Sequence, residues 1–133
     1  MRIFSKVKGT IDSATRKSQD AIEINKLNNQ IKKQEQEMEK LFRLIGEKVF
    51  NDSEFRKQDT KSYVDVQIKN IQHVKNQIQS MQRKVYFLKD LIECDSCAKI
   101  LPIRTKYCPD CGRNIAELAK SVAKQLATEQ IHD

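Results

Sequence analysis

The sequence predicts a mainly α-helical protein: an antiparallel helical hairpin (coiled coil), then a small four-cysteine unit and a C-terminal helix. Two long stretches place apolar residues at alternating intervals of three and four, the repeat of a helix seam. Charged residues make up 32% of the chain, against only 3 Gly and 2 Pro in 133 residues, a composition typical of long helices. The four cysteines fall in two C-x-x-C pairs.

Composition also argues against several classes of protein. Aromatic residues are only 6% of the chain and Trp is absent, so we expect no large core with a deep ligand pocket. The sequence contains no Gly-rich phosphate loop and no Ser-based nucleophile motif, so we do not expect an enzyme. We find no secretory signal and no run of about 20 apolar residues, and therefore predict a cytoplasmic protein.

The first element, residues 1–23, is predicted to be a basic amphipathic helix. Residues 1–20 contain five basic and two acidic side chains. Its apolar positions recur at helical spacing: Phe4, Val7, Ile11, Ala14 and Ala21.

Residues 24–93 are predicted to form the hairpin. The first seam contains Ile24, Leu27, Ile31, Gln34, Met38, Leu41, Ile45 and Lys48. Residues 51–60 are polar apart from Phe55 and break the repeat, so we interpret them as the connection, with Asp59, Thr60 or Ser62 as the next N-cap. The second seam contains Val64, Gln67, Ile71, Val74, Ile78, Met81, Val85, Leu88 and Ile92. Because the runs are similar in length and the link is short, the helices can fold back and bury seam against seam.

Residues 94–112 contain the cysteines, as C-D-S-C, ten residues, and C-P-D-C-G. Two such pairs at this separation predict a zinc ribbon, in which each C-x-x-C turn aims two sulfurs at one point. The ligands are predicted to be Cys94, Cys97, Cys108 and Cys111, holding one structural Zn²⁺. With four protein ligands no position is left for water or substrate, so the site is expected to be structural rather than catalytic.

The local chemistry refines this prediction and leaves alternatives. We expect strands at 98–101 and 104–107, a left-handed backbone at Gly112, and Tyr107 packed as a shield for the metal. Four nearby cations could offset the thiolate charge: Lys99, Arg104, Lys106 and Arg113. Iron binds to the same set of four sulfurs, so it remains an alternative to zinc. A redox dithiol is less well supported by the cysteine pattern, and disulfides are less well supported by the predicted compartment.

Residues 113–133 are predicted to form an amphipathic helix over 114–131. Asn114 and Glu117 fit an N-cap and N3 pair. One face is apolar and contains Ile115, Leu118, Val122 and Leu126.

The segment IECDSCAKILPIRTKYCPDCGRNI resembles a bacterial zinc ribbon of the C-x-x-C…C-P-x-C-G type. The layout of residues 1–112 is similar to small zinc-ribbon-domain proteins of Gram-positive bacteria, which place a basic start and a helical hairpin before the ribbon. The resemblance implies that the same four cysteines are the zinc ligands. The helix after the ribbon is a departure from that layout.

These features together favour a non-catalytic, zinc-binding coiled-coil module that docks on protein partners or on itself. A nucleic-acid or transcription-complex accessory is an alternative, since the net charge is +7, although Glu35, Glu37, Glu39 and Glu47 interleave with the lysines. Peripheral membrane contact through residues 1–20 is a second alternative. His73 and His132 are predicted to be surface residues.

Overall fold

The computed structural model describes the backbone of residues 2–52 and 58–131, and the side chains of residues 15–52 and 58–129. It is mainly helical, as predicted. The elements in chain order are α1 (Arg2–Asn51), α2 (Gln58–Leu88), β1 (Leu91–Glu93), β2 (Ile100–Pro102) and α3 (Ile115–Ile131). The chain divides into two compact units, one formed by Asn28–Gln82 and one by Met1–Leu27 together with Arg83–Asp133. No helix among the described residues has the length and apolar character needed to cross a bilayer.

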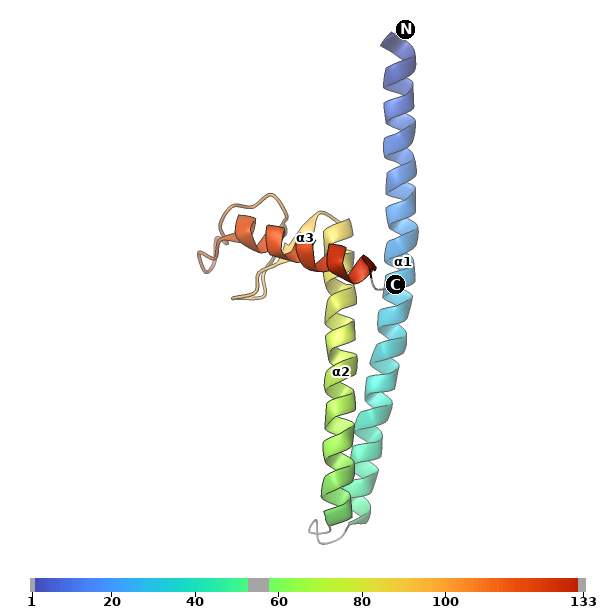
Figure 1. Cartoon of the computed structure of the whole chain (residues 1–133), viewed down its shortest axis with the longest axis vertical. Helices are drawn as coiled ribbons and strands as arrows, with labels where there is room; N and C mark the ends of the chain where they lie inside the picture. Colours follow the sequence, from blue (N-terminus) through green and yellow to red (C-terminus); the bar gives the residue numbers. More distant parts are fainter. Residues whose placement is uncertain (1, 53–57, 132–133) are drawn as a thin grey trace. The chain divides into compact units, whose positions relative to one another are not determined.

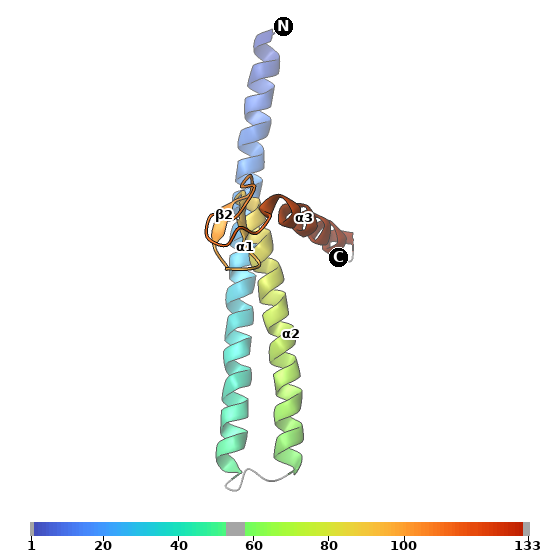
Figure 2. The same ribbon diagram turned by 90° about the vertical axis from the view of Figure 1, so that its left-hand side faces the viewer.

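The unit Asn28–Gln82 is a helical hairpin. The last half of α1 and most of α2 run side by side in opposite directions (Figures 1 and 2). Burial follows the predicted seams: Ile31, Leu41 and Val74 are buried. The other apolar seam residues of this unit are all at least half-buried, namely Met38, Ile45, Val64, Ile71, Ile78 and Met81. The predicted hairpin is therefore confirmed, and the three–four repeat identifies its interior correctly.

The predicted helix over residues 1–23 does not end before the hairpin, because α1 continues without a break from Arg2 to Asn51. No strong helix breaker stands at the junction, where the sequence reads Glu23–Ile24–Asn25. The apolar face proposed for Phe4, Val7, Ile11 and Ala14 lies outside the described side chains. Most of the predicted connection, residues 53–57, also lies outside the described residues, and α2 begins earlier than expected, at Gln58.

The end of the second helix differs from the prediction. α2 ends at Leu88, and Asp90 then adopts a left-handed backbone with φ of 57°. Ile92 is buried in strand β1 rather than in the helix seam. Ile92 fits the heptad repeat because it follows Leu88 by four residues, although the helix ends at Leu88 and a turn lies between them. Ile92 is therefore an apolar residue of the ribbon.

The ribbon is built on a two-stranded antiparallel sheet. β1 pairs with β2 in the register Leu91↔Pro102, Ile92↔Leu101 and Glu93↔Ile100. The prediction of strands at 98–101 and 104–107 is thus only partly right: Ile100 and Leu101 lie in a strand, but its partner comes before the first cysteine. The segment around Tyr107 instead forms an isolated bridge with Asn114.

Candidate metal centre

Each C-x-x-C pair forms the same hydrogen-bonded turn. In the first turn, the N–H of Ala98 donates to the carbonyl of Cys94 (2.9 Å), and the N–H of Cys94 donates to the carbonyl of Lys99 (2.8 Å). In the second turn, Gly112 donates to Cys108 (2.9 Å) and Cys108 donates to Arg113 (2.9 Å). We call these the first and second Cys turns, residues 94–99 and 108–113. Their equivalence shows that the two pairs are built to one geometry.

Both turns close through a residue in the left-handed region. Gly112 has φ of 77°, as predicted, and Ala98 has φ of 63° at the equivalent position of the first turn. Glycine adopts this conformation freely, whereas alanine has a Cβ that opposes it. The first Cys turn therefore holds a strained residue where the second has a relaxed one.

The strand and the bridge place the two turns against each other. The first Cys turn follows directly after β1 and leads into β2. The second is flanked by the Tyr107↔Asn114 bridge, and the N–H of Ile115 donates to the carbonyl of Lys106 (2.9 Å). Residues on both sides of each turn are thus fixed by backbone hydrogen bonds.

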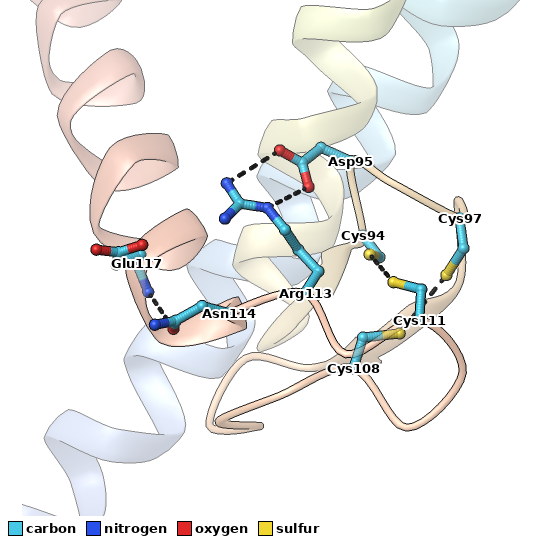
Figure 3. A network of polar contacts seen from close by, with 8 residues as sticks. All are labelled: Cys94, Asp95, Cys97, Cys108, Cys111, Arg113, Asn114 and Glu117. Atoms are coloured by element: carbon cyan, nitrogen blue, oxygen red, sulfur yellow. Dashed lines mark hydrogen bonds and ion pairs between the residues drawn. The ribbon is translucent and has the colours of Figure 1, made fainter.

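The four sulfurs converge at one point, as the sequence predicts. All four Sγ atoms lie within 4.8 Å of one another. Two close contacts cross between the turns: Cys94 Sγ to Cys111 Sγ and Cys97 Sγ to Cys108 Sγ are both 3.5 Å (Figure 3). Four sulfurs about 2.3 Å from a tetrahedral ion would stand about 3.8 Å apart, so the arrangement fits a single metal ion.

Each turn contains one buried and one exposed cysteine. Cys94 and Cys108 are buried, and Cys97 and Cys111 are exposed; all four are free thiols. The first cysteine of each turn therefore faces the protein interior and the second faces solvent.

The pKa values of two thiols, Cys97 and Cys108, are shifted in opposite directions. Burial raises the pKa of the Cys108 thiol, but the backbone N–H groups of Asp110 and Cys111, with the thiol of Cys97, lower it to about 7. The backbone N–H of Lys99 lowers the pKa of Cys97, yet hydrogen bonds with the other thiols and burial together raise it to about 12. The pKa of one thiol is thus lowered and that of a neighbouring thiol is raised. A divalent ion would favour the thiolate form of all four.

Two ion pairs join the first Cys turn to the second. Arg113 Nε lies 3.0 Å from Asp95 Oδ1, and Lys99 Nζ lies 2.8 Å from Asp110 Oδ1. The hydrogen bond from Arg113 lowers the pKa of the Asp95 carboxyl. Of the cations expected to offset the thiolate charge, Lys99 and Arg113 are therefore also paired with carboxylates. Sequence reasoning missed both aspartates, because nothing in the spacing shows that side chains 11 and 18 residues apart meet.

Two of the four cysteines belong to a cluster of buried apolar residues. It consists of Ile92, Cys94, Leu101, Cys108 and Ile115. Ile115 has no exposed surface, and three residues of α3 pack against the cluster: Leu118, Ala119 and Val122. The first turn of α3 thus shares its core with the cysteines.

The start of α3 is capped as predicted. The N–H of Glu117 donates to Asn114 Oδ1 at 3.1 Å, which is the N-cap to N3 bond (Figure 3). The prediction of Tyr107 as a core residue is wrong, since Tyr107 is 63% exposed. His73 is exposed as predicted, whereas His132 lies outside the described residues.

Fold and site together show two long helices packed as a hairpin and four closely spaced cysteines that could hold a metal ion, an arrangement consistent with a zinc-ribbon-like motif. Comparison with family models, curated proteins and solved structures returned no match to this chain.

Proposed function

We propose that the chain is a non-catalytic, zinc-binding interaction module. The observation that carries the proposal is the convergence of four free thiols within 4.8 Å of one another. A site with four protein sulfurs offers no open coordination position, so its metal would hold structure rather than bind a substrate.

Zinc is the ion that the donor set favours. Four cysteine thiolates in a closed tetrahedral arrangement are typical of structural zinc. Iron accepts the same donors, but it would give the protein a visible colour, which makes the two metals easy to separate.

The metal would act by fixing one segment to the next. The ribbon lies between the end of α2 at Leu88 and the start of α3 at Ile115. The Cys turns contribute Cys94 and Cys108 to the same buried cluster as Ile115. An ion pair also links α2 to α3, between Lys84 Nζ and Glu129 Oε2 at 3.9 Å. Metal binding would therefore order the whole C-terminal region and present its surface in one arrangement to a partner.

Metal content measured on single-site variants tests this proposal. The purified wild-type chain should contain one zinc per chain, and Cys94→Ser or Cys111→Ser should lose it and loosen the C-terminal region. Ser96→Ala is the matched control, because Ser96 lies in the first Cys turn without being a ligand. Unchanged zinc in either cysteine variant would refute the ligand assignment, and bound iron would refute the choice of metal.

The interaction role needs a separate readout. Affinity purification with the wild-type chain and with Cys111→Ser would compare the proteins that each retains. Partners lost with the metal would support a zinc-dependent module, whereas identical sets would mean that the ribbon has no part in docking.

A further inference from the structure

Two cysteines of the metal centre are open to solvent. Cys97 and Cys111 are exposed, whereas Cys94 and Cys108 are buried. Oxidants react with thiolates that they can reach, and cysteines that are fully buried stay inert. A site whose four cysteines were all buried would therefore resist oxidation. Here each Cys turn presents one cysteine to solvent, so the centre has two positions at which oxidation can begin.

Each exposed cysteine has a thiol neighbour in the other Cys turn. Cys111 Sγ lies 3.5 Å from Cys94 Sγ, and Cys97 Sγ lies 3.5 Å from Cys108 Sγ (Figure 3). A cysteine that has been oxidised to a sulfenic acid condenses with a neighbouring thiol to form a disulfide. Because an S–S bond is about 2 Å long, the sulfurs of each pair must approach by only about 1.5 Å.

The fold and the chain order favour different disulfides. Along the chain, the cysteines of each Cys turn are three residues apart, whereas the two pairs in close contact are 17 and 11 residues apart. Closing a short loop costs less entropy, so an unfolded chain should join the two cysteines of one turn. We call such a bond a within-turn disulfide, and a bond from one Cys turn to the other a cross-turn disulfide.

Contacts that need no metal hold the two Cys turns side by side. Two ion pairs join the first Cys turn to the second, through Asp95 with Arg113 and through Lys99 with Asp110. The buried cysteine of each turn also belongs to one apolar cluster with Ile115. These contacts favour the cross-turn pairs while the oxidation proceeds.

From these observations we infer that the four-cysteine centre is also a redox modification site for hydrogen peroxide. Oxidation forms the Cys94–Cys111 and Cys97–Cys108 disulfides and releases the zinc. The inference rests on the proposed zinc site and names how that site is regulated.

Each cross-turn disulfide consumes one molecule of hydrogen peroxide. The exposed thiolate attacks a peroxide oxygen, the O–O bond breaks, hydroxide leaves, and the sulfur becomes a sulfenic acid. The partner thiolate then attacks that sulfur, so that the S–S bond forms and a second hydroxide leaves. The two sulfurs lose two electrons, which the peroxide gains. The two disulfides leave no thiolate to hold the zinc, and exchange with an added dithiol restores all four thiols.

Disulfide mapping of the full, zinc-loaded chain after treatment with hydrogen peroxide tests the inference. Unreacted thiols are first blocked by alkylation. Trypsin then leaves both cysteines of a turn on one peptide, 90–99 or 107–113, so only cross-turn disulfides link the two peptides. Further cleavage before Asp95 and Asp110 separates all four cysteines and identifies each pair. A coloured chelator follows the zinc that is released from the same sample.

We expect the oxidised chain to contain mainly the Cys94–Cys111 and Cys97–Cys108 disulfides and to lose all of its zinc. Reduction with a dithiol should restore zinc binding. The matched control is the same chain, freed of zinc and oxidised in denaturant, which should give mainly within-turn disulfides because no fold aligns the turns.

Three results would overturn the inference. They are mainly within-turn disulfides in the folded chain, the same disulfides from the folded and the unfolded chain, or retention of zinc and all four thiols in a large molar excess of peroxide. Failure of the proposed zinc site would look different, because the purified chain would then contain no zinc before any peroxide is added.

Discussion

Arg113 and Asp95 form a bidentate ion pair that joins the two Cys turns. Arg113 Nε lies 3.0 Å from Asp95 Oδ1, and Arg113 Nη2 lies 3.3 Å from Asp95 Oδ2. Lys99 and Asp110 make the reciprocal link, with Lys99 in the first Cys turn and Asp110 in the second. Each turn thus supplies one cation and one carboxylate, and two ion pairs join the turns.

Loss of the Arg113–Asp95 pair should speed metal release. We expect Asp95→Asn to weaken zinc affinity by a few-fold and not by orders of magnitude, because both side chains are exposed and such pairs contribute little in water. Competition with a coloured chelator measures both affinity and release rate. Added salt should reproduce part of the effect in the wild type, since salt screens exposed charges.

The charge-swapped variant Asp95→Arg with Arg113→Asp separates the ion pair from a general disturbance. Restored affinity in the double variant, relative to each single one, would assign the effect to the pair. Equal losses in all three variants would show that the pair does not position the turns.

Ile115 links the metal centre to α3, so its truncation should be costly. Ile115→Ala removes a side chain with no exposed surface and is expected to destabilise the chain by about 2–5 kcal/mol. Thermal unfolding followed by circular dichroism measures the change. Ile100→Ala is the control, because Ile100 is 47% exposed on β2 and its loss should be small. Similar effects of the two changes would contradict the shared core of α3 and the ribbon.

The strained first Cys turn predicts a stabilising substitution. Ala98→Gly should stabilise the chain by about 1 kcal/mol, because glycine adopts the left-handed backbone at this position without a Cβ clash. Gly112→Ala should have the opposite effect at the equivalent position of the second turn. Denaturant unfolding of both variants with zinc bound measures the pair. Changes of the same sign would mean that the two turns are not equivalent.

Metal binding should release protons, and affinity should fall as the pH falls. The pKa of the Cys97 thiol is about 12 in the metal-free protein, so at neutral pH binding must displace at least the Cys97 proton. Each proton displaced lowers the apparent affinity about tenfold per pH unit of acidification. Calorimetric titration in two buffers of different ionisation enthalpy counts the released protons. A titration that releases none would show that the metal is not held by these thiols.

The sequence predicted those features that depend on local spacing. The buried positions of Leu41 in α1 and Val74 in α2 each follow from a repeat within a single helix. The convergence of the cysteines follows from two short turns. The spacing predicts Ile92 in the helix because an apolar residue at the right interval looks the same before and after a turn. The turn itself depends on Asp90, a non-glycine residue with φ of 57°, which composition does not reveal.

Contacts between residues far apart in the chain could not be predicted from the sequence. Asp95 and Asp110 find their cationic partners only because the sheet register and the two Cys turns bring them together. Its position before Cys108 predicts Tyr107 near the metal, yet Cys108 is buried in a cluster with Ile92, Leu101 and Ile115, and Tyr107 is exposed. Spacing along the chain predicted the clustering of the four cysteines, and it did not predict the residues around them.

X-ray absorption at the zinc edge tests the central claim most directly. For the purified chain we predict four sulfur neighbours at about 2.3 Å and no nitrogen or oxygen neighbour, since all four ligands are cysteine thiolates. A spectrum with fewer than four sulfurs, or with an oxygen in the first coordination sphere, would contradict a closed structural site.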